Sequence, residues 1–403
     1  MSSNDILSAS ASDRAGDASK TPIGTAGNMP APAAQIVSAT VLVVGAGPAG
    51  VAAAREAARA GHDVILAEAS SLPRHKSCGG MLNAYAQRWL EQVGGVPRSL
   101  MLDPAYVHFR YYDWDRSIKK PTTLRFVNVD RTAFDDWTMT LLPPNVRVWE
   151  RATLKSWAQD ASGVTAQLTR AGQPVEVRCA FLIGADGARS AVRRANEAWP
   201  QTACYRTVQE FVRIERGSVE PFFDCIYSRH IGAEYGYGYI MPKDDVAIVG
   251  SVFFPGSKGM PELHARALET FKQRYPLGET VRREAGTATQ VRSLADIIDG
   301  QGRVMLAGEA AGLMSPSSGE GISFAFNSGQ RCGAAVAKGL SVGRGKPDDE
   351  VRAARSAYMA ALEPIRKNIR FRLRMFPIMN SNWGKWIAGC LPAKLVSKVT
   401  EHV

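Results

Sequence analysis

The sequence contains no apolar run of the roughly 18 residues that a membrane-spanning helix needs. Its first residues also lack the basic start and the apolar centre of a secretory signal. Transit peptides to organelles are poor in acids, whereas Asp5, Asp13 and Asp17 stand in this stretch. These absences argue against a membrane-spanning, secreted or organelle-targeted protein, and we expect a cytoplasmic location.

Closely spaced cysteine pairs are also absent. The six cysteines are Cys78, Cys179, Cys204, Cys225, Cys332 and Cys390, and no two of them form a CxxC pair. Scattered cysteines argue against a disulfide framework and against a zinc site built from paired thiolates. We therefore expect no bound metal, and a reducing compartment fits this composition.

Acidic residues are scarcer than basic ones. The chain carries 49 Lys and Arg against 38 Asp and Glu, which gives a formal net charge of +11. Such a surplus suits nucleic acid, an anionic membrane surface or a phosphate-bearing cofactor. No zinc-finger spacing and no RNA-binding aromatic motif is present, so we expect no nucleic-acid partner.

Much of the basic surplus lies near the C-terminus. The basic residues of an expected helix there are Arg352, Arg355, Arg366, Lys367, Arg370, Arg372 and Arg374. Apolar residues follow, among them Trp383 and Trp386, with lysines between them. This pattern resembles an interfacial segment, which would hold the protein at the inner face of the membrane. The alternative, which we favour slightly, is a helix pair packed on the core with a solvated basic face.

A glycine-rich turn is the strongest motif that is present. The apolar run Val41–Val44 predicts a buried parallel strand, and Gly45-Ala46-Gly47-Pro48-Ala49-Gly50 follows it directly. Glycines at this spacing let the chain turn into a helix whose N-terminal N–H groups meet a pyrophosphate. Gly61 would end that helix, and Glu68, with Ala69 beside it, can accept the ribose hydroxyls. The motif predicts an adenine-dinucleotide site and leaves NAD and FAD as alternatives.

The remaining segments suggest how the chain is organised. Residues 1–38 are rich in Ser, Ala, Asp, Gly and Pro, and we expect a disordered tail. We expect half-buried strands at 107–112 and 124–129, a helix from Asp130, and an antiparallel meander of 146–148, 164–168 and 175–177. Alternating aromatic-rich segments between about 199 and 290 suit an antiparallel sheet with one face toward a ligand. A long helix should begin near Ile322.

Three segments resemble a flavoprotein family that includes the p-hydroxybenzoate hydroxylase-type enzymes and the geranylgeranyl reductases. They are the glycine turn, the run from Gly184 to Arg193, and the run from Gly308 to Ile322. The closer likeness is to geranylgeranyl reductases and a CbrA-type bacterial branch. It is carried by Lys76-Ser77-Cys78-Gly79-Gly80 and by Tyr237-Gly238-Tyr239-Ile240-Met241-Pro242 with Gly250 beyond. Tyr239 and Met241 stand where the reductases have Trp and Phe, which implies a different cavity shape.

The resemblance implies an α/β plus antiparallel β fold. A Rossmann-like FAD-binding domain of the glutathione reductase type would comprise residues 39–100, 128–198 and 285–340. An inserted antiparallel-sheet substrate domain would comprise residues 101–127 and 199–284, and a basic helical segment would comprise residues 341–403. The cofactor is then FAD. No second dinucleotide motif is present, so NAD(P)H is expected to bind transiently as the electron donor or to be replaced by another reductant.

The resemblance also implies which residues lie at the cofactor. Glu309 would accept flavin ribityl hydroxyls where the family has Asp, and Gly319 and Gly321 would open a helix whose positive end faces the flavin ring. Arg131 matches a family position that contacts FAD, although a surface salt bridge at a helix start is the alternative. The residues expected at FAD are Gly45, Gly47, Pro48, Ala49, Gly50, Glu68, Ala69, Lys76, Cys78, Gly79, Arg131, Asp186, Gly187, Gly308, Glu309, Pro316, Gly319, Glu320, Gly321 and Ile322.

Three residues are candidates for catalysis. Cys78 is expected beside the flavin ring, where its thiol can donate a proton; a small residue packed beside two glycines is the alternative. Tyr237 and Tyr239 are expected to line the substrate cavity, with a packed sheet face as the alternative.

The resemblance implies an FAD-dependent oxidoreductase that reduces carbon–carbon double bonds of a hydrophobic, isoprenoid-like small molecule or lipid with electrons from NAD(P)H or another donor. One alternative is an NAD(P)H-dependent flavin monooxygenase that hydroxylates or epoxidises an aromatic or prenylated substrate. Another is a non-catalytic, membrane-associated flavoprotein. Flavin-dependent halogenation is disfavoured because the Trp-x-Trp-x-Ile-Pro motif of that class is absent and the Tyr237 segment is its nearest counterpart.

Overall fold

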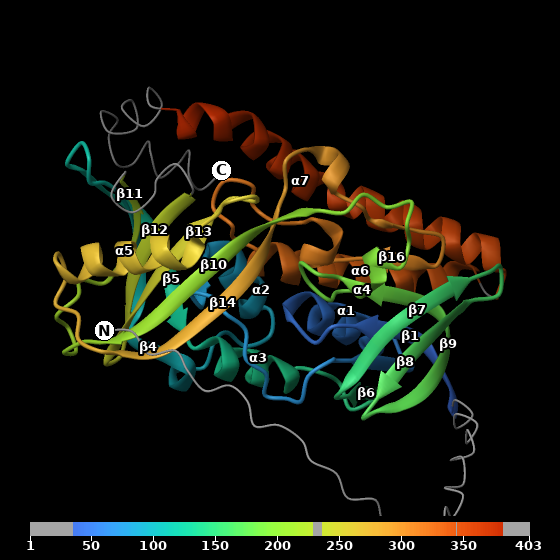
Figure 1. The fold of residues 1–403 in the computed structure, drawn as a ribbon. Coiled ribbons are helices and arrows are strands. Elements are labelled where there is room, and N and C mark those ends of the chain that lie inside the picture. The colour runs from blue at the N-terminus through green and yellow to red at the C-terminus, as the bar shows by residue number, and fades with distance from the viewer. Residues whose placement is uncertain (1–34, 229–235, 344, 382–403) are drawn as a thin grey trace, which may run out of the picture. The chain divides into compact units, whose positions relative to one another are not determined.

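The computed structural model describes residues 35–228, 236–343 and 345–381, which form two eight-stranded sheets with helices packed against them (Figure 1). The fold class is therefore mixed α/β plus antiparallel β, as the sequence predicts. The boundaries suggested between the FAD-binding and substrate domains stay predictions.

The first sheet has a parallel centre. Its strand order is β15-β16-β9-β1-β2-β6, with β8 pairing β9 and β7 outside it. The strands are β1 (Gln35–Val44), β2 (Val64–Ala67), β6 (Val146–Trp149), β7 (Ala152–Gln159), β8 (Val164–Arg170), β9 (Gln173–Gly184), β15 (Gly300–Gln301) and β16 (Val304–Leu306). Val41–Val44 are buried between β2 and β9, which confirms the buried parallel strand before the glycine turn.

The structure corrects two expectations about this sheet. Residues 146–148 were expected in an antiparallel meander, but β6 pairs in parallel with β2, and the meander consists of β7, β8 and β9. Since β6 follows the helix α3 (Arg131–Met139), the chain crosses the sheet before re-entering it, and the pairing becomes parallel. Residues 35–38 were expected in a disordered tail, but they pair with β9; residues 1–34 of that tail lie outside the described residues.

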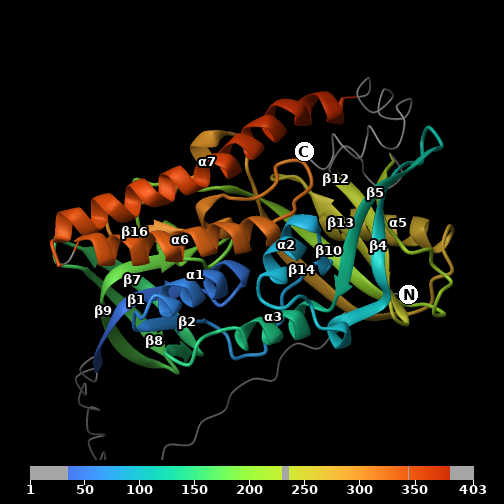
Figure 2. The same cartoon turned by 180° about the vertical axis from the view of Figure 1, so that it is seen from behind.

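Three helices are stacked against the first sheet. They are α1 (Pro48–Arg59), α6 (Ile322–Gly343) and α7 (Pro347–Asn380), and Figure 2 shows them one above another. A Cβ built on Gly329 would lie 2.1 Å from the Ala49 carbonyl oxygen, so glycine lets α6 approach α1 closely. The start of the long helix at Ile322 is confirmed. Through residue 381, the C-terminal region is a helix packed on the core by Ala354, Tyr358 and Leu362.

The second sheet is mostly antiparallel. Its order is β14-β10-β13-β12-β11-β4-β5-β3, and β11 pairs with β4 in parallel. The strands are β3 (Met81–Leu82), β4 (Met101–Asp113), β5 (Ile118–Val129), β10 (Ala203–Arg213), β11 (Phe222–Tyr227), β12 (Gly236–Lys243), β13 (Val246–Phe253) and β14 (Thr280–Gln290). The expected strands at 107–112 and 124–129 and the alternating segments beyond residue 199 are confirmed.

Smaller helices complete the described fold. The helix α5 (Met260–Lys272) packs on β13 of the second sheet, and α4 (Ala191–Arg194) follows β9. The helix α2 (Ala84–Glu91) contacts α6 through Trp89, whose ring stacks on Phe326 with centroids 4.2 Å apart. Among the described residues, no helix is long and apolar enough to cross a membrane.

Candidate functional site

The glycine turn before α1 has the geometry that a phosphate cradle requires. Gly45 has a φ of +102°, and a Cβ there would lie 2.5 Å from the Ala185 carbonyl oxygen. A Cβ on Gly50 would lie 1.7 Å from the Gly45 carbonyl oxygen. Gly47 caps α1 without a side-chain hydrogen bond, and Pro48 occupies the first turn. The turn therefore presents backbone and the positive helix end, which fits a pyrophosphate.

Glu68 joins this turn at the end of β2. One carboxylate oxygen, Oε2, accepts hydrogen bonds from the Ala46 backbone N–H at 3.0 Å and from the Arg74 Nε at 3.2 Å. The other, Oε1, accepts one from the Ser70 N–H at 3.0 Å. The residue is buried, and Ala69 beside it is exposed. The expected ribose-binding carboxylate is thus fixed against the turn that would hold the pyrophosphate.

Arg74 is a site residue that the sequence analysis did not assign. Besides contacting Glu68, its Nη2 lies 3.4 Å from Asp135 Oδ2 and 3.2 Å from the position of a Cβ on Gly47. A cation therefore lies over the glycine turn, where a pyrophosphate needs one. The loop position after Glu68 was visible in the sequence, but Asp135, far along the chain, was not recognisable as its partner.

Arg131 lies in the interior, so the alternative of a surface salt bridge is wrong. Its Nε and Nη2 donate to the two Asp135 oxygens at 3.0 and 2.9 Å. Burial alone would lower the pKa of Arg131, but Asp135 and the adjacent Cys78 thiol raise it above its usual value. The guanidinium is therefore a permanent buried cation beside Cys78.

The second motif contains a buried oxygen in need of a donor. Asp186 Oδ2 accepts hydrogen bonds from the Ala191 and Val192 N–H groups at 2.6 and 3.2 Å. Its Oδ1 is buried and has no hydrogen-bond partner among the described residues. Burial raises the pKa of Asp186. Such an oxygen fits a hydroxyl donor of a bound cofactor, because an unpaired buried acceptor is costly.

Glu309 of the third motif reaches across to the second sheet. Its Oε1 accepts a hydrogen bond from the Thr289 N–H of β14 at 2.7 Å, and its Oε2 lies 3.5 Å from Lys76 Nζ. A Cβ on Gly187 would lie 3.8 Å from that Oε2. The structure thus brings together Lys76, Gly187 and Glu309. The extra methylene relative to the family's Asp allows the contact with β14.

The same motif forms the turn into α6. Gly319 has a φ of +65°, and Glu320 accepts hydrogen bonds from the Ser323 N–H and hydroxyl at 2.7 and 2.8 Å. Burial raises the pKa of Glu320. The Tyr237 hydroxyl lies 3.8 Å from the position of a Cβ on Gly319. A residue expected in the substrate cavity therefore lies close to the turn expected at the flavin ring. Pro316, Gly321 and Ile322 flank Gly319 along the chain, whereas a Cβ on Gly308 would lie 2.8 Å from Ala49 Cβ.

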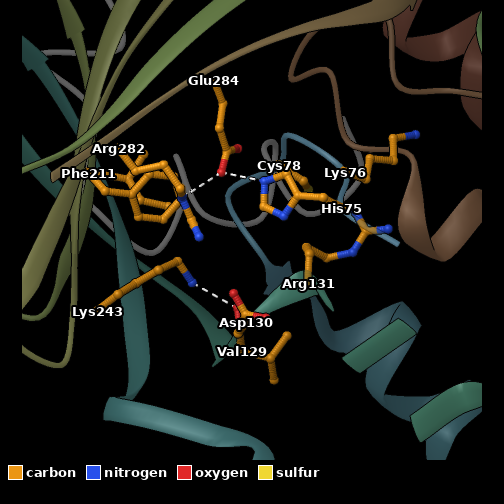
Figure 3. Close-up of a pocket in the computed structure, with 11 residues that line it drawn as sticks. His75, Lys76, Cys78, Val129, Asp130, Arg131, Phe211, Lys243, Arg282 and Glu284 are labelled. Carbon is orange, nitrogen blue, oxygen red and sulfur yellow. Dashed lines mark hydrogen bonds and ion pairs between the residues drawn. The ribbon is translucent and has the colours of Figure 1, made fainter. Parts of the chain in front are cut away.

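Cys78 lines a small pocket between the second sheet and the start of α3, together with Arg131, Lys243 and Glu284 (Figure 3). Lys243 was missed, although it directly follows the Tyr237–Pro242 motif. Its Nζ donates to Asn128 Oδ1 at 2.6 Å and to the Val129 carbonyl at 2.9 Å. Burial lowers the pKa of Lys243 to about 8. The pocket therefore combines a thiol with a cation that titrates near neutral pH.

Gly79 follows Cys78 and faces Met241 of β12. A Cβ there would lie 2.7 Å from Met241 Cε, so glycine lets the Cys78 loop approach β12. Met241 stands where the reductases have Phe. The expectation of a small, glycine-flanked segment at this point of the site fits the observed contact.

Tyr239 connects to this pocket through hydrogen bonds and does not itself line it. Its hydroxyl donates to Gln209 Oε1 at 2.9 Å, and Gln209 Nε2 donates to Glu284 Oε2 at 2.7 Å. Glu284 Oε1 lies 2.5 Å from Nε2 of His75, whose side chain is 49% exposed. A chain of polar groups thus runs from a buried ring to a solvent-facing imidazole. Position 250 has no room for a side chain beside the Tyr239 ring, because a Cβ on Gly250 would lie 2.0 Å from that ring.

The segment Arg74–Gly80 is the junction of the site. Arg74 contacts Glu68 of the first sheet, His75 contacts Glu284 of the second, and Lys76 contacts Glu309. A Cβ on Gly80 would lie 2.1 Å from the Val129 carbonyl oxygen, so this end of the segment is held against β5. The structure therefore brings the three sequence motifs and the candidate cavity together around one loop.

Sequence comparisons assign the first part of the chain to flavin binding. Residues 38–203 match a family described as an FAD binding domain. Protein CbrA of Escherichia coli strain K12 is 30% identical over 294 residues, which cover 72% of this chain and 81% of that protein. Protein CbrA of Shigella dysenteriae is 30% identical over 296 residues, covering 72% and 82% respectively.

Solved structures agree on the fold. A geranylgeranyl bacteriochlorophyll reductase-like protein from Thermoplasma acidophilum is 20% identical with a TM-score of 0.68, covering 91% of this chain and 100% of that one. The p-nitrophenol 4-monooxygenase of Pseudomonas putida is 17% identical with a TM-score of 0.60, covering 88% and 97%. At these identities the likeness establishes the fold alone.

Proposed function

Since the chain belongs to the CbrA branch of the FAD-dependent oxidoreductase superfamily, we propose that it reduces carbon–carbon double bonds of a hydrophobic, isoprenoid-like substrate. The chemistry that FAD would supply, once reduced by NAD(P)H or another donor, is hydride transfer to one carbon of the double bond. The protein must then deliver a proton to the other carbon. The double bond thus gains one hydride, which brings two electrons, and one proton. No group leaves the substrate.

The observation that carries this proposal is the pairing of Cys78 and Lys243 in one pocket. A general acid works best when its pKa lies near the ambient pH, and burial brings the pKa of Lys243 to about 8. We assign proton delivery to the substrate to the Cys78 thiol. The Lys243 ammonium then donates a proton to the resulting thiolate and becomes a neutral amine. Arg131, a cation at every physiological pH, stabilises the thiolate left between the two steps.

The residues that would hold FAD follow from the fit of the site. The turn Gly45–Gly50 with Arg74 would take the pyrophosphate, and Glu68 the adenosine ribose. Asp186 has the unpaired oxygen that a flavin-side hydroxyl satisfies. The Gly319–Gly321 turn at α6 would face the ring. The other expected contacts, including Glu309 toward the ribityl chain, belong to the same proposal.

The test is anaerobic reoxidation of the dithionite-reduced, FAD-loaded protein by a geranylgeranyl lipid. We expect the lipid to reoxidise the flavin without oxygen. The matched variants are Cys78→Ala and Cys78→Ser, because serine keeps a donor of similar size. We expect C78A to slow this step by about 10²-fold or more and C78S to recover part of the loss.

Two results would count against the proposal. Reoxidation only by O2, with an oxygen atom added to an aromatic or prenylated substrate, would identify a monooxygenase. FAD binding without turnover of any lipid would leave a non-catalytic flavoprotein. Equal rates for the wild type and both Cys78 variants would remove the role of the thiol while leaving the reductase intact.

A further inference from the structure

The helix α7 buries one side and exposes a strongly basic one. Tyr358, Leu362, Ile365 and Ile369 pack on the core. On the opposite side, Arg366, Lys367, Arg370 and Arg374 recur at helical spacings of three and four residues and are exposed or half-exposed. Within the described residues, none of these four cations forms an ion pair, although Glu363 lies on the same side.

Large apolar side chains share this side with the cations. Met359 is 53% exposed, Phe371 43% and Ile378 50%. An ordinary solvated face does not require them, since leaving such groups in water forgoes their burial. We call the set of four cations and these three apolar residues the outer face of α7.

The charge along α7 is divided. Asp348, Asp349 and Glu350 lie in its first turn, and the cations of the outer face lie in its second half. Beyond that half the sequence continues with Trp383, Trp386 and Lys385, residue types that favour the membrane interface. The basic and apolar character is thus concentrated toward one end of the helix.

We infer that the outer face of α7 is a docking surface for an anionic lipid bilayer. The four cations match the negative charge of lipid headgroups. The three large apolar side chains fit the boundary between headgroups and acyl chains, and the arginine stems can lie along it. A nucleic acid backbone would match the charge alone and would leave the apolar residues without a role.

The turn expected at the flavin ring packs against the buried side of the same helical segment, opposite the docking surface. Arg372, on the buried side of the same helical segment, donates from Nη1 to Ser315 Oγ at 2.8 Å. Its guanidinium carbon lies 5.7 Å from the centre of the Phe324 ring of α6. Docking would therefore leave the Pro316–Gly321 turn separated from the bilayer by about one helix diameter, roughly 10 Å. That lipid substrates then enter directly from the membrane rests on the proposed function.

The test is co-sedimentation of the full-length, FAD-loaded, oxidised protein with lipid vesicles. We expect binding to phosphatidylglycerol–phosphatidylcholine vesicles, little binding to phosphatidylcholine alone, and weakening as salt rises from about 0.1 to 0.5 M. Neutralising the four cations (R366Q, K367Q, R370Q and R374Q together) should lower partitioning into the vesicles by roughly a hundredfold. A cation in full contact with the headgroups contributes about fivefold, and we assume that not all four are in full contact. Phe371→Ser with Ile378→Ser should weaken binding without changing the charge.

A matched variant separates location from net charge. Arg59, Arg178, Arg213 and Arg216 have side chains 58%, 60%, 52% and 61% exposed and lie on other elements. Neutralising them together removes the same formal charge and should leave most of the binding.

An equal loss of vesicle binding in both quadruple variants would overturn the docking surface. So would a wild-type protein that does not bind anionic vesicles, or one that binds nucleic acid in preference to them. Because no turnover is measured, failure of the proposed reductase would leave this result standing, and failure of docking would leave the reductase standing.

Discussion

Gly47 and Gly50 lie in the same turn, but added side chains would meet different neighbours. A Cβ on Gly50 would lie 1.7 Å from the backbone oxygen of Gly45, whereas a Cβ on Gly47 would lie 3.2 Å from the end of the flexible Arg74 side chain. Gly47 also has a φ of −83°, which alanine adopts easily. The fold therefore needs glycine at position 50, whereas at position 47 only the proposed pyrophosphate contact would need it.

We predict that Gly47→Ala folds with a loss of about 1 kcal/mol or less but loses most of its FAD affinity. Gly50→Ala should lose about 3 kcal/mol or more of unfolding free energy, because backbone must move. Chemical denaturation without FAD measures the free energy of unfolding of both variants, and titration with FAD measures their affinity for the cofactor. A G47A protein that binds FAD as tightly as the wild type would contradict the placement of the pyrophosphate.

Lys243 gives the reaction a pH dependence of defined sign. Its pKa of about 8 means that the ammonium, the form that can return a proton, predominates below pH 8 and disappears above it. We predict that lipid-dependent reoxidation falls by about tenfold per pH unit above 8. The Lys243→Met variant should be slow at every pH and should not show this fall above pH 8. The variant at the exposed Lys119, Lys119→Met, should still show it. A wild-type rate that stays constant from pH 7 to 10 would rule out the assigned role.

The sequence identified the individual residues of this pocket unevenly. Cys78 and Arg131 were found because each stands in a family motif. Lys243 and Arg74 were missed because their importance comes from partners distant in sequence, Asn128 and Asp135 respectively. A buried ion pair or a lowered pKa is a property of packing, and no local spacing encodes it.

At the scale of elements, α7 is tied to the first sheet by a buried hydrogen bond. The Tyr358 hydroxyl donates to the Leu306 carbonyl of β16 at 2.7 Å, and the tyrosine is fully buried. Removing the hydroxyl leaves that acceptor without this donor.

We predict that Tyr358→Phe lowers the free energy of unfolding by about 1–2 kcal/mol. Tyr85→Phe is the matched control, because Tyr85 is 38% exposed and should change stability by less than about 0.5 kcal/mol. Denaturant titration of the FAD-loaded proteins compares them. Equal midpoints for both variants would mean that this bond does not hold α7 in place.

Strands with strong alternation or strong apolar character were predicted correctly, as β1, β4 and β12 illustrate. The pairing of β6 was wrong because four residues of Val-Arg-Val-Trp carry no information about which strand lies beside them. The chain reaches β6 through α3 and so enters the sheet parallel to β2. That pairing depends on the topology of the fold and not on the four residues themselves. Similarly, the Tyr237–Tyr239 alternation indicated a strand but did not show that the two side chains contact different parts of the site.

For the whole molecule, the loop Arg74–Gly80 explains how motifs spread over the chain form one site. Arg74, His75 and Lys76 each contact a carboxylate on a different segment: Glu68, Glu284 and Glu309. The dinucleotide turn fixes one end of the cofactor site, and β12 and β14 of the second sheet face the other end. The loop between them places Cys78 where cofactor and substrate are expected to meet.

We propose that this protein uses reduced FAD to add two hydrogens across a carbon–carbon double bond. The mass of a geranylgeranyl lipid after anaerobic incubation with the reduced protein tests this reaction. We expect a product heavier by two hydrogen atoms for each double bond reduced, formed more slowly by C78A. A lipid that stays unchanged without oxygen and gains an oxygen atom when air is admitted would contradict it.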